Sequence, residues 1–384
     1  MSLLRQRGHA DSGKVGMVEL FFDLVFVFAV TQLSHSLLKK LDMQGALQTG
    51  LLFMATWWVW IYTVWATNWF DPEKKQVRAA LFALLVAGLL MSVSIPRAFT
   101  DLGWLFGASI LLQQVGRTVA MLACSRGDNP SLRRNFMRMI VWLTASGALW
   151  VAGGLAAPES RMAWWLAALA VDLAAPMLLY YVPGLQRSTM ADWNVDGSHM
   201  AERCALFIII ALGESLLVTG ATFAELPFDS ATVGAFLLAV LGTILMWWLY
   251  FDHGLEQGHH RIVHSATPGR HARNSYTYLH IPIVAGIIVG AVGDELVLSH
   301  PHHGNAAAMA AIIGGPLLFL CGTALFKWLA QTRALPPLSH LLGIALLLVL
   351  AALALPLHLS PLLAAGLTVL VLLFVAVWES CVLR

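Results

Sequence analysis

Ionisable residues interrupt an almost wholly apolar stretch at residues 18–35. Glu19, Asp23, Thr31 and His35 lie in this stretch, and at about 100° per residue they fall on one half of a helix. Positions 19 and 35 are about 24 Å apart along such a helix. Because ionisable groups at membrane depth are costly and mostly persist for function, the pattern predicts an ion-binding or proton-relaying stripe. The alternative is a set of surface and interhelical contacts in which only Asp23 needs a partner.

A second apolar run, at residues 200–223, carries Glu202 and Glu214, which are about 18 Å apart on a helix. A carboxylate as deep as Glu214 must be protonated, paired with a cation or in contact with water. Arg117 is the basic residue that falls in the middle of an apolar run, so it is the candidate partner of Glu214. Such a pair is equally compatible with a structural role.

A third run, at residues 276–297, contains His280 just before Pro282, Gly286 and Gly290 at GxxxG spacing, and Asp294 near its far end. The glycine spacing predicts close packing against another helix. His280 lies where backbone groups are freed by the proline, which suits a ligand or proton site, although a buried structural histidine fits the same position. The predicted ion- or substrate-binding residues are therefore Glu19, Asp23, Thr31, His35, Arg117, Glu202, Glu214, His280 and Asp294.

No metal site and no catalytic residue is predicted, and the sequence leaves cofactors open. The chain has 14 histidines, and several of them gather in a loop at residues 253–271. Their spacing is irregular, no cysteine joins them and arginines share the loop, so the sequence does not say whether this loop binds metal. The 4 cysteines are isolated, and no motif of a known hydrolase or nucleotide-binding site appears in a plausible context.

The elements that carry these residues are those of an integral membrane protein. The chain has 384 residues, of which 59% are hydrophobic and 11% charged, with a mean hydropathy of +0.74. A soluble domain has about 25% charged residues. We expect a lipid bilayer as partner, with no nucleic acid, and no cleaved signal peptide in the first residues. Tryptophans near the ends of the runs, such as Trp57 and Trp60, are expected to anchor the chain at the membrane surface. For Trp60 and Trp65 the alternative is that they line a cavity.

Apolar runs of the length that crosses a bilayer recur along the whole chain. We expect an all-α polytopic membrane protein of about twelve transmembrane helices in two parallel six-helix repeats. The expected parts are a cytoplasmic tail at 1–17, a first repeat at 18–183, a cytoplasmic linker at 184–199 and a second repeat at 200–384. The expected spans are 18–38, 45–67, 77–97, 102–124, 136–156, 161–183, 200–223, 232–252, 276–297, 306–330, 338–356 and 361–382.

The distribution of lysine and arginine predicts the orientation. If the N-terminus is cytoplasmic, only Lys39, Lys40, Arg97 and Arg161 of the 23 basic residues lie on the opposite side, and Arg117 lies within a span. Positive charge is kept on the cytoplasmic side of short loops. We therefore expect a multi-pass protein of the bacterial inner membrane with both termini in the cytoplasm.

Four segments, in order along the chain, resemble the bacterial low temperature requirement protein A (LtrA) family. They are ELFFDLVFVFAVTQLSH, the Trp-rich run that ends in TNWFD, ERCALFIIIALGES and YLHIPIVAGIIVGAVGDE. The resemblance implies a polytopic membrane protein named after a cold-growth phenotype. More distantly, FFDLVFVFAVTQL resembles the first helix of the lysosomal potassium channel family, which has six spans per repeat and a Phe-Ser-Asp motif. Phe22 stands where that family has serine.

These observations lead to three hypotheses for the function. The first is a transporter coupled to protons or another cation, in which Asp23 and Glu19 bind the ion and Glu214, His35 and His280 assist. The second is a cation channel whose pore is built by the first helix of each repeat. The third is an intramembrane enzyme or cofactor-binding sensor that uses the histidines. The expected partner is a small ion or small molecule, and a homodimer is possible.

Overall fold

The computed structural model describes residues 3–5, 14–125, 130–189, 193, 195–252, 268–330 and 335–382. Within these ranges the regular structure is helical, apart from two isolated bridges, Leu4 with Phe70 and Val182 with Gln186. Among the described residues, nine helices are long and apolar enough to cross a membrane. The expectation of an all-α polytopic membrane protein is confirmed.

Each of the twelve runs predicted from the sequence is occupied by helix. The first half of the chain forms α1 (Met17–Lys39), α2 (Met43–Trp69), α3 (Lys75–Ser94) with η1 (Ile95–Arg97), α4 (Gly103–Leu111), the π-helical η2 (Leu112–Gly116), α5 (Arg117–Cys124), α6 (Pro130–Leu155) and α7 (Pro158–Met177). The second half forms α8 (Gly197–Glu225), α9 (Ser230–Phe251), α11 (Pro268–His271), the π-helical η4 (Ala272–Tyr278), α12 (His280–Ser299), α13 (Ala306–Ala330), α14 (Leu338–Ala354) and α15 (Pro361–Val382).

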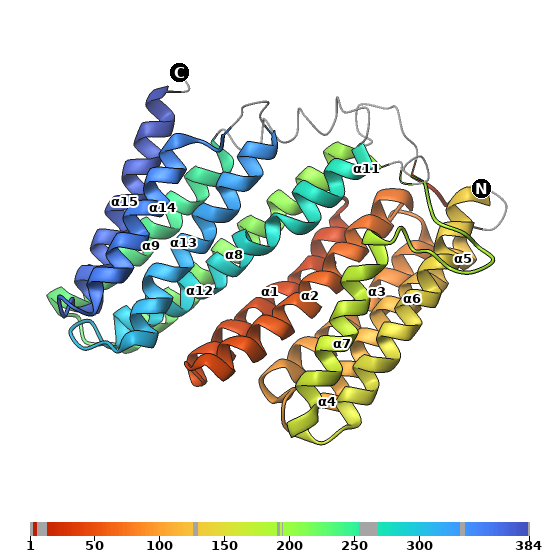
Figure 1. Cartoon of the computed structure of the whole chain (residues 1–384), viewed down its shortest axis with the longest axis horizontal. Coiled ribbons are helices and arrows are strands. Elements are labelled where there is room, and N and C mark those ends of the chain that lie inside the picture. The colour runs from red at the N-terminus through yellow and green to blue at the C-terminus, as the bar shows by residue number, and fades with distance from the viewer. Residues whose placement is uncertain are drawn as a thin grey trace. The chain divides into compact units, whose positions relative to one another are not determined.

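The chain divides into two compact units. Of the described residues, the first unit takes those within Met1–Ser36, Gln44–Arg203 and Ala266–Ala272. The second takes those within Leu37–Met43, Cys204–Ser265 and Arg273–Arg384. In Figure 1 the helices of the first unit, from α1 to α7, run side by side in red to yellow-green, and those of the second run side by side in green to blue. The first turns of α8, up to Arg203, belong to the first unit.

The core of the first unit is built around α2. Trp57, Trp58 and Trp60 are each 1% exposed or less, and Trp65 and Trp69 pack on Trp193. The expectation that Trp57 and Trp60 anchor the membrane surface is therefore wrong. Aromatic rings of this size contribute large buried areas, which explains why a Trp-rich helix forms the centre of a bundle. The same tryptophans, with threonines and an asparagine, keep α2 out of the group of strongly apolar helices.

In the second unit α12 packs closely on α13 through glycines. A Cβ added at Gly286 would lie 2.5 Å from the backbone nitrogen of Phe319, and one added at Gly293 would lie 2.9 Å from the Cα of Ile312. At Gly290 an added Cβ would meet only the end of Met246, at 3.5 Å, but a Cβ added at Gly315 of α13 would lie 2.7 Å from the Gly290 Cα, so the backbone at Gly290 also packs closely on α13. The predicted packing role of the glycine pair in residues 276–297 is thus confirmed, since both Gly286 and Gly290 lie against the backbone of α13.

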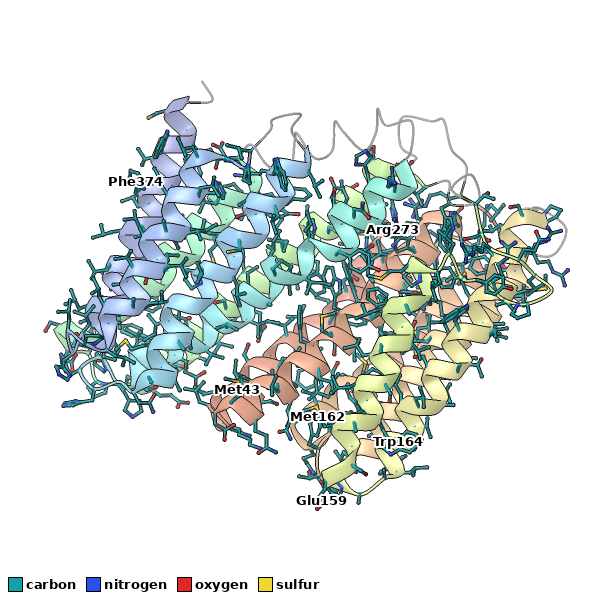
Figure 2. All side chains as sticks on the ribbon, in the orientation of Figure 1. Met43, Glu159, Met162, Trp164, Arg273 and Phe374 are labelled. Carbon is teal, nitrogen blue, oxygen red and sulfur yellow. The ribbon has the colours of Figure 1, made fainter. Side chains whose placement is uncertain are left out.

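Large apolar side chains also cover the outside of both units. Trp164 of the first unit and Phe374 of the second are 41% and 42% exposed, and Figure 2 shows both on the outer side of their helices. Leu217 and Leu370 are exposed to 70% and 59%. Exposed apolar surface on this scale indicates contact with lipid, which agrees with a multi-pass membrane protein.

Candidate functional site

A fully buried arginine holds two carboxylates together in the first unit. Arg203 Nη1 donates to Glu19 Oε1 at 2.8 Å, and Arg203 Nη2 donates to Asp23 Oδ1 at 2.6 Å. All three side chains are 0% exposed. Because Glu19 and Asp23 lie one turn apart on α1, one planar guanidinium reaches both. The arrangement is one cation shared by two anions in an environment without bulk water.

Glu19 receives three further hydrogen bonds. Arg5 Nη2 donates to Oε2 at 2.9 Å, the backbone N–H of Gly16 donates to the same oxygen at 2.9 Å, and His199 Nε2 lies 2.8 Å from Oε1. Arg5 is held near Glu19 because its backbone N–H donates to the Trp69 carbonyl at the end of α2. Both oxygens of Glu19 are therefore fully engaged by charged or polar donors, which are the stronger kind of hydrogen bond.

The hydrogen bonds of Asn68 favour one protonation state of His199. The Asn68 amide nitrogen donates to the Asp196 carbonyl at 2.8 Å, and the Asp196 backbone N–H donates to Asn68 Oδ1 at 2.8 Å. This two-way pairing fixes the orientation of the amide, so its second N–H points at His199 Nδ1, 3.2 Å away. Nδ1 then accepts. Nε2 lies 2.8 Å from Glu19 Oε1 and 3.3 Å from Arg5 Nη2, and we assign its hydrogen to the shorter contact, with Glu19. His199 is neutral in this arrangement.

The charges of the cluster balance. Glu19 and Asp23 contribute two negative charges, Arg203 and Arg5 contribute two positive charges, and His199 contributes none. Buried ions persist only when they are paired and hydrogen bonded, since removing one partner leaves an uncompensated charge. We call this set the Arg203 cluster: Arg5, Glu19, Asp23, Trp60, Thr67, Asn68, His199 and Arg203.

At the contact between Asp23 and Arg203, one oxygen and one nitrogen are buried without a hydrogen-bond partner among the described residues. Asp23 Oδ1 accepts from Trp60 Nε1 at 2.8 Å as well as from Arg203, but Asp23 Oδ2 is buried and accepts nothing. Arg203 Nε is likewise buried without an acceptor. Buried polar atoms are nearly always hydrogen bonded, so each exception needs an explanation. Asp23 Oδ2 is a place where a proton or a water hydrogen can bind.

A second buried polar group in the first unit involves Asp172 of α7. Asp172 Oδ1 accepts from Ser146 Oγ at 2.5 Å, and Oδ2 accepts from Trp150 Nε1 at 2.9 Å. Both donors come from α6, so the group joins two neighbouring helices. Both oxygens of Asp172 already accept a hydrogen bond, so no ligand is needed to explain this carboxylate. The two hydrogen bonds hold α6 and α7 together.

Arg117 makes its hydrogen bonds to neutral groups of the first unit. Its guanidinium donates to the Val59 carbonyl and to Thr63 Oγ1, both at 3.2 Å, and to Gln114, and it lies over the Tyr62 ring. Glu214, its candidate partner from the sequence, belongs to the second unit and is half-buried. Arg117 thus ties the π-helical segment η2 to α2.

Three of the other expected residues of α1 and α8 are placed differently from Glu19 and Asp23. Thr31 donates back to the Val27 carbonyl at 3.1 Å, and His35 is half-buried further along α1. Glu202 is exposed, whereas its neighbour Arg203 is buried. Adjacent residues on a helix point about 100° apart, so only one of this pair can face α1.

In the second unit, His280 has both ring nitrogens occupied. Nδ1 donates to the Ser275 carbonyl at 2.9 Å, and Nε2 accepts from the Tyr250 hydroxyl at 2.7 Å. The ring is 0% exposed and stacks on Tyr276. These contacts describe a histidine that holds η4 against α9. Asp294 lies further along α12 and lines a cavity that is described below.

Sequence reasoning missed several members of the Arg203 cluster. His199, Arg203, Asn68 and Arg5 were not among the predicted site residues, and Trp60 was expected either at the membrane surface or in the wall of a cavity. One signal was available, because His199 and Arg203 are four residues apart and so share a face of α8. Most of the histidine-rich loop, residues 253–267, lies outside the described residues.

Two comparisons with known proteins find matches over almost the whole chain. The family model described as bacterial low temperature requirement A protein (LtrA) matches residues 14–377. A protein of Rhizobium meliloti (strain 1021), named only as uncharacterized protein RA0937, is 39% identical over 381 residues, which cover 99% of this chain and 92% of that protein. No solved structure matches the chain.

Proposed function

This chain belongs to the bacterial low temperature requirement A (LtrA) family. We propose that it is a proton-coupled membrane transporter in which Asp23 takes up the proton. The observation that carries the proposal is the unequal use of the Asp23 oxygens. Oδ1 accepts two hydrogen bonds, whereas Oδ2 is buried with no partner among the described residues. A proton can therefore bind Oδ2 without breaking the contacts of Oδ1.

Protonation of Asp23 changes the balance of the Arg203 cluster. With Asp23 neutral, Arg203 keeps Glu19 as its only carboxylate partner of full charge. A pair of unit charges about 4 Å apart is worth about 4 kcal/mol at an effective dielectric constant of about 20. A change of that size shifts the ratio of two conformations by about 10³-fold. One proton is thus enough to bias a helix arrangement that depends on the contact between α1 and α8.

A direct cation site at Glu19 and Asp23 is less well supported, and so is a channel lined by them. Both carboxylates are 0% exposed and already hold Arg203, with Arg5 on Glu19 as well. A permeating cation would have to displace a bound guanidinium. Unitary currents in a planar bilayer that do not need a proton gradient would favour the channel instead.

The proposal includes an orientation in the bacterial inner membrane with both termini in the cytoplasm. It rests on the lysine and arginine distribution, which leaves only Lys39, Lys40, Arg97 and Arg161 on the opposite side. A green fluorescent protein fused after residue 384 is expected to fluoresce, and alkaline phosphatase fused there is expected to be inactive. The reverse pair of results would contradict the orientation.

Proton movement in proteoliposomes tests the transport proposal. Vesicles that contain a pH-sensitive dye and the purified chain are exposed to a gradient of sodium, potassium, a small carboxylate or a small amine. We expect at least one of these solutes to drive a saturable change of internal pH that Asp23→Asn abolishes. The matched control is Asp101→Asn, because Asp101 is an exposed carboxylate paired with Arg97.

Two results would contradict the proposal. One is a wild-type response no larger than that of protein-free vesicles for every solute class. The other is an equal response of the wild type and of Asp23→Asn, provided that both are inserted in equal amounts. The second result would leave a transporter without the proposed proton site.

A further inference from the structure

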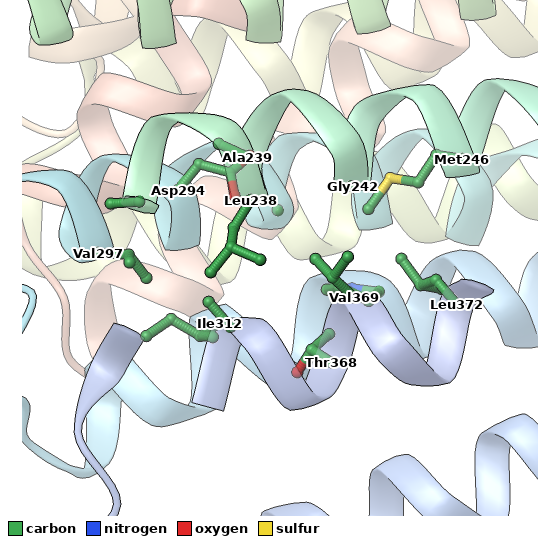
Figure 3. Close-up of a pocket in the computed structure, with 14 residues that line it drawn as sticks. Leu238, Ala239, Gly242, Met246, Asp294, Val297, Ile312, Thr368, Val369 and Leu372 are labelled. Atoms are coloured by element: carbon green, nitrogen blue, oxygen red, sulfur yellow. The ribbon is translucent and has the colours of Figure 1, made fainter. Parts of the chain in front are cut away.

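A small cavity lies inside the second unit, between α9, α12, α13 and α15. It has a volume of about 30 Å³, and about 10–15 Å³ is enough to hold one ordered water. Its wall is mostly aliphatic, with Met246, Val369 and Leu372 among the lining residues (Figure 3). Gly242 and Gly290 line it as well, and the absence of their side chains helps to keep the space open.

Two polar side chains face this apolar cavity from different helices. Asp294 of α12 is half-buried and lines the cavity, and it has no hydrogen bond or ion pair with any residue that the structure describes. Thr368 of α15 is 3% exposed, and its hydroxyl is buried without a partner in the same described ranges. Figure 3 shows the two residues on opposite sides of the group of lining side chains. The carboxylate and the hydroxyl do not hydrogen bond to each other. Each therefore needs a partner that the described residues do not supply.

The lining decides what that ligand is. The lining residues from α9, α13 and α15 include no charged or titratable side chain, and on α12 the nearest such neighbour is Glu295, which is not part of the lining. A carboxylate in such a place must be neutralised by a proton or by a bound cation. Calcium takes about 6–8 oxygen ligands and magnesium about six. Asp294 and Thr368 together supply three side-chain oxygens, which is too few for either ion.

We propose that Asp294 is a proton-binding carboxyl group and that a water in the cavity links it to the Thr368 hydroxyl. The proton binds one oxygen of Asp294, and the water supplies the exchange path between the carboxyl and the hydroxyl. This site belongs to the second unit and is argued from the cavity alone. It does not depend on the proposed transport or on the Arg203 cluster.

Carbodiimide labelling tests this proposal without any transport assay. Dicyclohexylcarbodiimide reacts with a protonated carboxyl in an apolar setting: the carboxyl oxygen adds to the central carbon, the proton moves to nitrogen, and rearrangement leaves a stable N-acylurea. The full chain in liposomes is treated near neutral pH, where an ordinary aspartate with a pKa of about 3.9 is ionised. We expect peptide mapping by mass spectrometry to find the adduct on Asp294, with a yield that falls as the pH is raised.

Variants separate the site from its surroundings. Asp294→Asn is expected to lose the adduct, and Glu295→Gln, one residue further along α12, is expected to keep it. Thr368→Val removes one partner of the water, so the anion is less well solvated and the midpoint of labelling moves up by about one pH unit or less. Thr323→Val on α13 is the matched control, since Thr323 donates to its own helix at Phe319 and does not line the cavity.

Three outcomes would overturn the proposal. The first is no adduct on Asp294 in the wild type at any pH, which is informative even if Asp294→Asn fails to fold. The second is loss of the adduct when sodium chloride replaces choline chloride at constant pH, because the ligand is then a metal cation. The third is an equal shift in Thr368→Val and Thr323→Val, which removes Thr368 and the shared water from the site.

Discussion

A single guanidinium, that of Arg203, serves two carboxylates that α1 presents on successive turns. Such a buried ion pair adds little net stability by itself, but removing one partner leaves the other charge buried and unpaired. Breaking a buried ion pair by removing one partner costs about 3–5 kcal/mol, because the other charge stays in the apolar interior. Without Arg203, Asp23 would have no positively charged partner in the cluster. Glu19 would keep only Arg5 and His199 as side-chain partners.

Arg203→Gln is therefore expected to destabilise the protein strongly. The free energy of unfolding should fall by about 3–5 kcal/mol, measured by thermal or denaturant unfolding of the purified chain in detergent. Arg97→Gln is the control, because Arg97 pairs with Asp101 on the surface, where its side chain is 60% exposed. Exposed pairs contribute about 1 kcal/mol or less.

The double variant Arg203→Gln with Asp23→Asn gives the decisive comparison. It removes one of the two carboxylates that Arg203 neutralised, so it should recover part of the stability lost in Arg203→Gln. If the double variant is less stable than Arg203→Gln by the full effect of Asp23→Asn alone, the two residues are not coupled in the way that their 2.6 Å contact implies.

At this scale the sequence predicted the two acids but not the group that binds them. Glu19 and Asp23 were identifiable because a carboxylate in an apolar run is unusual. Arg203 follows Glu202 directly, and only the rotation of α8 decides which of the two is buried. That rotation depends on packing against elements far away in the chain, which a local pattern does not contain.

Among the elements, α12 and α13 depend on glycine for their contact. The backbone of α13 at Phe319 lies where a side chain at Gly286 would have to go. By contrast, a Cβ added at Gly314 of α13 meets nothing within 4 Å. Two glycines in neighbouring helices thus have different reasons to be glycine, and only the first is required by packing.

Gly286→Ala and Gly314→Ala are expected to change stability in opposite directions. The first forces a backbone shift and should cost about 1–3 kcal/mol by overpacking. The second replaces a helical glycine in open space and should gain up to about 1 kcal/mol from helix propensity. Melting temperatures of the two variants and the wild type in the same detergent measure the difference. Equal melting temperatures for the two variants would show that the α12–α13 contact is loose.

Asp229 caps the N-terminus of α9 outside the spanning segments. Its Oδ1 accepts from the Thr232 backbone N–H at 2.8 Å, and this hydrogen bond, with that of the Thr232 hydroxyl, holds the pKa of the carboxyl below its ordinary value. A lowered pKa in the folded state means that the cap stabilises the helix above the unfolded pKa of about 3.9. That contribution is lost as the pH falls through the lower folded value.

Hydrogen exchange of the first turn of α9 measures this effect. In the wild type, protection of the Thr232 amide, corrected for intrinsic exchange, should fall when the pH is lowered below about 3.9. Asp229→Asn keeps an acceptor and should remove the pH dependence, whereas Asp229→Ala should lower protection at neutral pH. A pH dependence that survives in Asp229→Asn would assign the effect to another group.

Helix ends were the least predictable part of the elements. The expected span 136–156 begins earlier in the structure, at Pro130, because Arg133 and Arg134 lie in the helix but outside the apolar run. The expected span 161–183 ends earlier, at Met177, since Leu179 and Tyr180 have positive φ angles of 53° and 50°. An apolar run marks what lipid covers, and a helix can continue beyond it or stop within it.

For the whole molecule, composition and run length were enough to predict an all-α polytopic membrane protein, and the family match over residues 14–377 covers both units. The two parallel six-helix repeats stay a prediction, as do the boundaries at 183 and 200. Because composition is a sum over the whole chain, the prediction of the fold class does not depend on the exact ends of single helices. A repeat is a relation between two sets of packed helices, and sequence offsets that drift along the chain describe it only indirectly.

The sequence separation within the Arg203 cluster has a consequence for biogenesis. Asp23 and Arg203 are 180 residues apart, and Glu19 and Arg203 are 184 apart. A ribosome therefore completes α1 to α7 before the guanidinium that neutralises the carboxylates of α1 has been made. We expect a nascent chain stopped after residue 189 to be degraded faster in a pulse-chase experiment than one stopped after residue 225, and Glu19→Gln with Asp23→Asn to narrow that difference. The carboxylates of α1, the first helix to be made, are then neutralised by Arg203 only after the other helices of the first unit have been made.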